Sequence, residues 1–171
     1  MALSKITADS FDTGSPARRN LPTGSVLQVV NIQSSAFTST TTLIPLDNTI
    51  PQNTEGTELF TLSITPTSAT TKLKIDVVLH GGVSVGAWAS LAIFQDSNAN
   101  AIAATSSYMS QAGGAIAIPL TYFMTSGTTS ATTFKLRYGP NTGTMGINGN
   151  NTAGFFNGTL YTSMTITEIA A

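Results

Sequence analysis

The sequence of 171 residues contains no cysteine. The chain therefore forms no disulfide and offers neither a thiolate nucleophile nor a cysteine-ligated zinc site. Charge is also scarce, because Asp, Glu, Lys and Arg make up 9% of the residues and the formal net charge is -1. No run approaches the roughly 18 apolar residues of a membrane span, and the first residues lack the continuous apolar core of a signal peptide. We expect synthesis in a cytoplasm and no membrane insertion.

The few basic residues are not gathered on one segment. Lys and Arg number 7, and they cluster only at Arg18-Arg19 and at Lys72 with Lys74. This pattern gives no nucleic-acid footprint. Hydrophobic residues reach 41%, which favours a folded chain over a disordered one. A surface rich in Thr and Ser but almost neutral promotes association, so we expect a partner or further copies of the chain to cover part of it.

Short stretches with the composition of β-strands recur along the chain, with turn residues between them. The β-branched and aromatic content and the Gly, Pro and Asn punctuation predict strands over 25–32, 37–45, 58–65, 72–80, 87–95, 116–124, 132–138, 143–147 and 159–169. This number of strands in one domain indicates an all-β fold, an antiparallel two-sheet β-sandwich of the jelly-roll kind.

The clearest alternation lies in residues 132–138. Phe134, Leu136 and Tyr138 share one face, while Lys135 and Arg137 share the other, which predicts a core face and a wet face. In 72–80 the alternation is interrupted by adjacent Val and Leu residues, and we expect burial on both faces there. Pro119 cannot donate a ladder hydrogen bond, so its strand is predicted to lie at a sheet edge or to be bulged.

The N-terminal segment differs from the rest, and we divide the chain into an attachment arm at 1–22 and a β-sandwich domain at 23–171. The arm is rich in charge and poor in core residues. Its sizeable apolar groups are Leu3, Ile6 and Phe11. An isolated short helix is marginal in water, so the arm needs a partner to order it. We expect these three residues to dock on that partner, with Arg18 and Arg19 contacting its acidic groups.

Catalytic groups are sparse. His80 is the only histidine, so a Ser/His/Asp site would need it together with Ser84 or Ser90 and with Asp76 or Asp96. The chain has no Gly-x-Ser-x-Gly elbow, and a strand-end histidine satisfied by backbone or solvent is the favoured interpretation. The run GGVSVG at 81–86 resembles a phosphate loop, but no helix pattern follows it, which favours a flexible loop before a strand.

Oxygen ligands and aromatic rings allow three further hypotheses. Asp47, Glu55 and Glu58 lie near one connection and could act as the paired carboxylates of a depolymerase, although a solvated loop is favoured. Asp96 with Asn98 and Asn100 has a spacing that could hold calcium, but an Asx turn explains it equally well. Aromatic residues could line a sugar site, with core packing as the default; they are Trp88, Tyr108, Tyr122, Tyr138 and Tyr161.

Five segments carry a resemblance to a known group of proteins. They are LSITPTSATTKLKIDVVLHGG, LAIFQDSNANAIAA, TTFKLRYGP and the terminal FFNGTLYTSMTITEIAA, in this order, after the opening MALSKITADSFDTG. Together they resemble the β-rich domain at the C-terminal end of bacteriophage tail-fibre proteins and related virion proteins. Such fibres usually place a long shaft between arm and tip, whereas here only residues 14–24 separate them. The compact arrangement is therefore also similar to capsid decoration proteins.

The resemblance implies a non-enzymatic structural protein without cofactors, exposed on the exterior of a phage particle. A short tail fibre or adhesin tip that recognises a host-surface glycan or protein is the first expectation, and a decoration (cement) protein that stabilises the head shell is the second. A polysaccharide depolymerase is a distant third. Members of both structural groups are commonly homotrimers, so we expect a homotrimer that docks on other virion proteins, of the tail or the capsid, through the arm.

Overall fold

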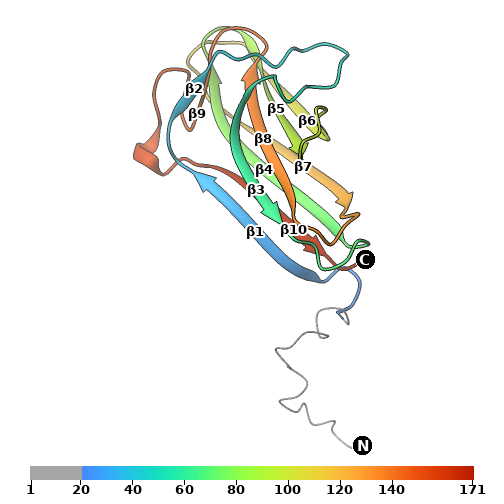
Figure 1. The fold of residues 1–171 in the computed structure, drawn as a ribbon. Coiled ribbons are helices and arrows are strands. Elements are labelled where there is room, and N and C mark those ends of the chain that lie inside the picture. The colour runs from blue at the N-terminus through green and yellow to red at the C-terminus, as the bar shows by residue number, and fades with distance from the viewer. Residues whose placement is uncertain (1–20) are drawn as a thin grey trace, which may run out of the picture.

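A computed structural model describes residues 21–171. The predicted docking residues Leu3, Ile6, Phe11, Arg18 and Arg19 lie outside the described residues. Within 21–171 the structure is all-β apart from a short 3-10 turn at Phe156–Gly158, and two antiparallel sheets form a sandwich (Figure 1). The predicted fold class is confirmed. No helix in this part of the chain is long and apolar enough to cross a membrane.

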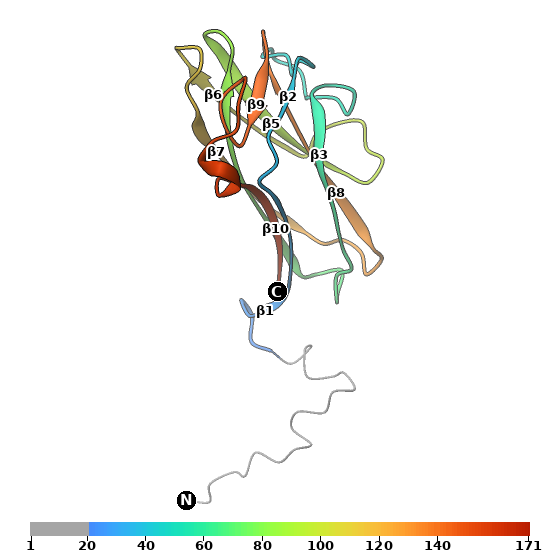
Figure 2. The same cartoon turned by 90° about the vertical axis from the view of Figure 1, so that its left-hand side faces the viewer.

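The two sheets differ in size. The six-stranded sheet has the order β1-β10-β4-β9-β2, with β7 paired on the other edge of β4, and the four-stranded sheet has the order β3-β8-β5-β6. Figure 2 shows the two layers from the side. The first sheet contains β1 (Val26–Ser34), β2 (Thr38–Thr40), β4 (Lys72–Val83), β7 (Ile116–Thr125), β9 (Met145–Ile147) and β10 (Thr162–Ile169). The second contains β3 (Thr57–Ile64), β5 (Ala87–Gln95), β6 (Ala103–Met109) and β8 (Thr132–Pro140).

The strand pairing identifies the sandwich as a jelly roll. β5 pairs with β6, β4 with β7, β3 with β8 and β1 with β10, all antiparallel. These pairs are nested in the sequence, so the chain follows one long hairpin whose tip is β5–β6 and which rolls up into two layers. The rolled hairpin of eight strands is the jelly-roll arrangement. The short strands β2 and β9 extend the first sheet beside the end of β4.

The core lies between the sheets and follows the alternation of the strands. In β8 the side chains of Phe134, Leu136 and Tyr138 are fully buried, as the sequence predicts. Leu73 and Ile75 of β4 belong to the same hydrophobic cluster. Because every second residue of each long strand points inward, the outward residues of both sheets remain available for other contacts.

The structure differs from the sequence predictions at several places. The strand β6 was not predicted, since its small and polar residues carry little hydrophobic alternation. The strand expected at 37–45 is reduced to β2 (Thr38–Thr40), and the last strand begins at Thr162 rather than at 159. Val78 is 39% exposed, so burial on both faces of β4 was wrong at that position. Burial on both faces begins only at Gly81–Val83.

The flexible loop expected over 81–86 was wrong at its first residues. Gly81 and Gly82 are part of β4. A Cβ on Gly81 would lie 2.5 Å from the carbonyl oxygen of Gly146, and a Cβ on Gly82 would overlap the carbonyl oxygen of Gly114. Glycine is therefore required here because neighbouring backbone approaches closely.

One connection covers the outside of the four-stranded sheet. Residues 41–56, which we call the strap, join β2 to β3. Ile44 of the strap packs on Ala92 and Phe94, the outward residues of β5, in a second hydrophobic cluster. The Ile44 amide donates to the Pro140 carbonyl at 3.0 Å. The strap thus turns part of an outer sheet face into a small second core, and two hollows border it.

Candidate functional site

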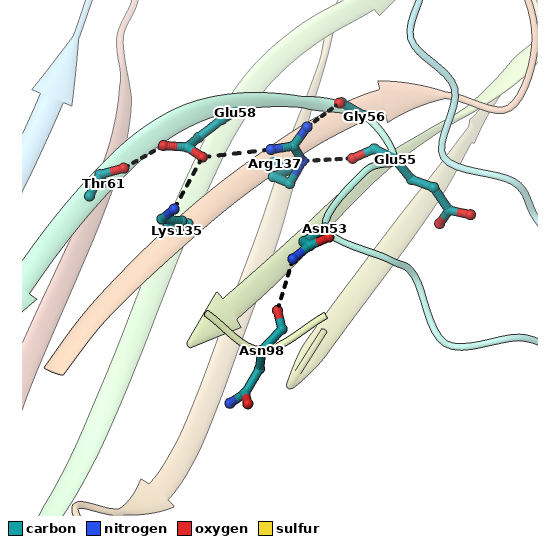
Figure 3. Close-up of polar contacts among 8 residues, drawn as sticks. All are labelled: Asn53, Glu55, Gly56, Glu58, Thr61, Asn98, Lys135 and Arg137. Atoms are coloured by element: carbon teal, nitrogen blue, oxygen red, sulfur yellow. Dashed lines mark hydrogen bonds and ion pairs between the residues drawn. The ribbon is translucent and has the colours of Figure 1, made fainter. Parts of the chain in front are cut away.

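The larger hollow is a polar groove of about 360 Å³ at the C-terminal end of the strap. It is lined by Asn53, Glu58, Phe94, Asp96, Ser97, Asn98, Lys135 and Arg137. The strap and β3 form one wall, outward residues of β8 form the floor, and the turn after β5 forms the other wall. Figure 3 shows the polar contacts among these elements. The groove thus brings Glu58, one of the candidate paired carboxylates, together with Asp96 and Asn98, two of the candidate calcium ligands.

Arg137 holds the strap to β8. Its Nε donates to the Glu55 carbonyl and its Nη2 to the Gly56 carbonyl, each at 2.7 Å, while Nη1 lies 3.6 Å from the Glu58 carboxylate (Figure 3). The side chain is 17% exposed. The planar guanidinium can serve two carbonyls and a carboxylate at once because its donors are fixed in a fork. Arg137 is therefore an anchor of the strap.

Glu58 is engaged by its neighbours. One carboxylate oxygen accepts a hydrogen bond from the Thr61 hydroxyl, and the other lies 3.8 Å from the Lys135 ammonium as well as near Arg137. Exposed ion pairs of this kind contribute about 0–1 kcal/mol. The neighbouring cations leave Glu58 without the apolar setting that a general acid needs.

The other two predicted carboxylates, Asp47 and Glu55, are capped within their own turns. Asp47 accepts hydrogen bonds from the Thr49 hydroxyl and the Thr49 amide, which hold the pKa of Asp47 below its ordinary value. Glu55 accepts from the Gln52 amide at 2.9 Å. Asp47 and Glu55 are thus each engaged by a local hydrogen bond of their own turn.

The candidate calcium ligands form a turn. The Asp96 carboxylate accepts from the Thr133 amide at 2.8 Å, and its own amide donates to the Thr133 carbonyl at 2.7 Å. The Asn53 side chain reaches the Asn98 carbonyl at 3.4 Å, and Asn100 accepts from Gln52 at 2.9 Å. Within residues 21–171 no three His, Asp or Glu side chains are grouped as a metal site would need.

The structure does not assemble the possible Ser/His/Asp site. His80 Nδ1 lies 3.0 Å from the Tyr161 carbonyl, and Asp76 pairs with Lys74 at 2.8 Å. Ser84 accepts from the Thr144 amide at 2.9 Å, while Ser90 lies 2.9 Å from the Ser106 hydroxyl on the other sheet. Asp96 is at the groove described above. The backbone contact agrees with the favoured interpretation of His80, but the strand-end position was wrong, because β4 continues to Val83.

The smaller hollow, of about 230 Å³, lies between the first half of the strap and the strands β5 and β6. Its walls include Leu46, Asp47, Thr49, Ser90 and Ser106. Next along the same outward rows come Trp88 and Tyr108, which are cross-strand partners with ring centroids 5.3 Å apart. The Tyr108 ring is 55% exposed. We call Trp88 and Tyr108 the aromatic pair.

The outer face of the six-stranded sheet is nearly uncharged. Its central cross-strand rows are Val29–Thr167–Lys74–Phe123, Asn31–Thr165–Asp76–Thr121 and Gln33–Ser163–Val78–Pro119. A further outward row, Ile169–Lys72–Thr125, adds one cation at the end of this face. Lys74 and Asp76 neutralise each other. Val29 is 55% and Phe123 is 56% exposed, so large apolar groups stand among small hydroxyl side chains. Pro119 lies on β7, which among residues 21–171 pairs only with β4, so the predicted edge position is confirmed.

Sequence reasoning missed Glu168. This carboxylate is fully buried. Burial raises its pKa, but hydrogen bonds from Gln28, Thr71 and Thr67 outweigh burial and hold the pKa of Glu168 below its ordinary value. The signal was available, because Glu168 continues the inward positions of Thr162, Met164 and Ile166 in β10. A charged residue at an inward position of a strand indicates a buried polar network.

A further exposed apolar feature lies beside β10. Phe156 is 73% exposed and has a φ of 54°, a left-handed conformation that is costly for a bulky residue. Phe155 and Phe156 line a hollow of about 310 Å³ with His80 and the start of β7. Backbone strain here displays an aromatic side chain to solvent.

No family model and no curated protein matches this chain. Among solved structures, a chain in the structure of infectious bursal disease virus (Gx strain) is similar to this one, with 12% sequence identity and a TM-score of 0.40. The match covers 87% of this chain and 39% of the viral chain. A mutant VP2 protein of the same virus is 14% identical with a TM-score of 0.42, and the match covers 84% of this chain and 36% of the VP2 chain. The enzymatically active domain of bacteriophage CBA120 tailspike protein 4 is 12% identical with a TM-score of 0.29, and the match covers 70% of this chain and 18% of the tailspike chain. The chain thus spans less than two fifths of each of these proteins.

Proposed function

We propose that this protein is a non-enzymatic structural component exposed on the exterior of a phage particle, where it serves as a short tail fibre or adhesin tip that recognises the host surface. The observation that carries the proposal is that the two outer faces of the sandwich differ in charge and in shape. One face is nearly uncharged, which favours association, and the other carries the strap and two hollows open to solvent. The resemblance of the sequence segments to tail-fibre tips supports the same role.

The placement of the candidate catalytic residues supports a role without catalysis. His80, Ser90 and Asp96 lie apart and each is bonded to a different neighbour. Glu58 is paired with cations, and Asp47 has a lowered pKa, which is opposite to the raised pKa of a general acid. A depolymerase would have to build its site from other groups.

Assembly follows from the nearly uncharged face. We propose a homotrimer in which copies meet through the outer face of the six-stranded sheet rather than by adding strands at its edge. Pro119 removes a donor from the edge strand β7, and proline on an edge strand opposes strand addition. Residues 1–22 then attach the trimer to other virion proteins.

Capsid decoration is the second candidate, and one observation favours it. β1 begins at Val26, so the sandwich follows the arm with only a short connection and no shaft between them. A cement protein on a head lattice needs no reach, whereas a fibre usually does.

Copy number separates the two candidates. A quantified protein gel of purified particles should give tens of copies or fewer if the protein is a tail tip, and immunogold labelling should place them at one vertex. Hundreds of copies spread over the shell would replace the tail assignment by decoration. Hydrolysis of a host polysaccharide by the purified protein would overturn the non-enzymatic role.

A further inference from the structure

The dipeptide Asn-Gly occurs twice in the chain, as Asn148-Gly149 and as Asn157-Gly158. Both asparagines have a left-handed backbone, with a φ of 57° at Asn148 and of 47° at Asn157. The two positions therefore share their dipeptide and the sign of φ. Their surroundings differ, and this difference decides which of the two can react.

The side chain of Asn148 is held by hydrogen bonds at both of its polar atoms. Asn148 is 1% exposed, and its Nδ2 donates to the Ser34 carbonyl at 3.0 Å and to the Ala36 carbonyl at 2.8 Å. Its Oδ1 accepts from the Thr162 hydroxyl at 2.9 Å. The next residue is equally confined, because a Cβ on Gly149 would overlap a neighbouring carbonyl oxygen. Neither residue can rotate without disturbing packed structure.

Asn157 lies in the 3-10 turn before β10 and is exposed, and within residues 21–171 its side chain makes no hydrogen bond. The atom nearest to a Cβ on Gly158 would be Ser35 Oγ at 3.7 Å, an ordinary contact distance. The Thr159 amide and hydroxyl close the turn by donating to the Phe156 carbonyl at 3.1 Å and 2.8 Å. A short exposed turn opens at little cost, and the left-handed φ of Phe156 lowers that cost further. Asn157 can therefore change its torsion angles while the sandwich stays folded.

An asparagine followed by glycine can close a ring on itself. Base removes the proton of the Gly158 amide, whose nitrogen attacks the side-chain carbonyl carbon of Asn157. The bond from that carbon to Nδ2 breaks, Nδ2 leaves as ammonia, and a succinimide remains. Water then opens the ring, at the side-chain carbonyl to give aspartate or at the backbone carbonyl to give isoaspartate. Glycine favours the attack because it has no side chain in the way. Water is consumed and ammonia is released, and no other reactant is needed.

We infer that Asn157 is a self-modification site, which converts through a succinimide to aspartate and isoaspartate in the folded protein, whereas Asn148 stays intact. Each conversion adds one negative charge to a chain whose formal net charge is -1. Isoaspartate also lengthens the backbone by one carbon directly after Phe156, which is 73% exposed. The modification thus changes the charge and the shape of the loop that displays Phe156. It does not depend on the role proposed above.

The two asparagines can be compared in one experiment. Purified full-length protein is incubated at mildly alkaline pH, folded in buffer or unfolded in guanidinium chloride, and digested with trypsin. No Lys or Arg follows Arg137, so both sites lie on one peptide, and tandem mass spectrometry reports them together. In the folded protein we expect Asn148 to convert about 10- to 1,000-fold more slowly than Asn157, because three buried hydrogen bonds must open first. In guanidinium chloride the two rates should become similar.

Asn157→Gln is the matched variant, because it keeps a side-chain amide but would have to close a less favoured six-membered ring. Ion-exchange chromatography of the folded wild type should show an acidic species that accumulates with time, and Asn157→Gln should not form it. The inference is overturned if Asn157 stays intact in the folded protein over the time in which it converts in guanidinium chloride. Equal rates at Asn148 and Asn157 in the folded protein, or an acidic species that forms equally fast in Asn157→Gln, would also overturn it.

Discussion

The side-chain amide of Gln28 on β1 donates a hydrogen bond of 2.6 Å to the buried carboxylate of Glu168 on β10. The same carboxylate accepts from the Thr67 amide at 2.7 Å and from the Thr71 hydroxyl at 2.7 Å. One side chain therefore joins the two strands that begin and end the sandwich to the turn between β3 and β4. A buried charge is tolerated because every bond it makes favours the ionised form.

This arrangement predicts a loss of stability in acid. The pKa of Glu168 is lowered in the folded protein, while in the unfolded chain it lies near the ordinary value of about 4.3. The stabilisation is therefore fully present above about pH 4.3 and is lost as the pH falls through the lowered folded value. Glu168→Gln should cost about 1–3 kcal/mol at neutral pH, because donors that faced a carboxylate then face an amide.

Urea unfolding of the wild-type protein and of Glu168→Gln between pH 7 and pH 3 provides the measurement. The difference between the two should shrink as the pH falls. Glu58→Gln is the control, because an exposed ion pair should change stability by about 0–1 kcal/mol. A difference that is constant over this pH range would mean that Glu168 does not titrate as its contacts indicate.

The strap offers a second prediction. Arg137→Lys keeps the charge but cannot reproduce the three contacts of the guanidinium with Glu55, Gly56 and Glu58. Hydrogen exchange at residues 41–56 should therefore become faster, while the amides of β4 and β10 keep their protection. Lys135→Ala removes the neighbouring cation without touching the strap and should leave exchange there unchanged. Equal exchange in Arg137→Lys and wild type would show that the other contacts of the strap hold it without the guanidinium.

The alternation of β8 gives a third prediction. Phe134 is fully buried, so Phe134→Ala should lower the free energy of unfolding by about 3–5 kcal/mol. Lys135 points outward and is 39% exposed, so Lys135→Ala should change it by at most about 0.5 kcal/mol. Chemical denaturation of both variants compares adjacent residues on opposite faces. Similar losses would be incompatible with the two-layer packing of the strand.

Comparison of β8 with β6 explains which parts of the fold could be predicted from the sequence. β8 alternates large apolar residues such as Phe134 and Leu136 with charged ones, so its buried and exposed faces can be predicted from its own sequence. β6 contains small polar residues around Ser106 and becomes a strand because β5 offers it an edge. That edge is a property of the tertiary structure, which a local pattern does not contain.

For the groove and the aromatic pair, the sequence likewise indicated single residues but not how they come together. Glu58 and Asp96 were singled out by residue type, but their meeting in one groove depends on the strap and on the turn after β5, which bring distant segments together. Trp88 and Tyr108 were recognised only as aromatic residues in strands. Their pairing required β6, the strand that the sequence did not reveal.

The nearly uncharged face predicts how assembly can be disrupted. Light scattering coupled to gel filtration should give about three times the 17.7 kDa of one chain. Val78→Glu places a charge in the middle of the outer face of the six-stranded sheet, so it should shift the protein toward monomer while the fold melts cooperatively. Ser63→Glu on β3 of the other sheet is the control and should remain trimeric. A wild-type monomer at micromolar concentration would refute the proposed assembly.

The N-terminal segment predicts that folding and attachment can be separated. Residues 1–20 hold charge but few core residues, and the pairing of β1 with β10 begins only at Val26. Removal of residues 1–20 should therefore leave a soluble β protein that melts cooperatively yet no longer joins particles lacking the native gene product. Arg18→Glu combined with Arg19→Glu should weaken docking and make the remaining binding more sensitive to salt, because screening acts on exposed charge pairs. Lys135→Glu reverses a charge on the outer face of the four-stranded sheet, away from the proposed trimer face, and separates a specific effect of the arm from one of net charge. If the truncated protein still decorates particles normally, attachment occurs through the sandwich itself.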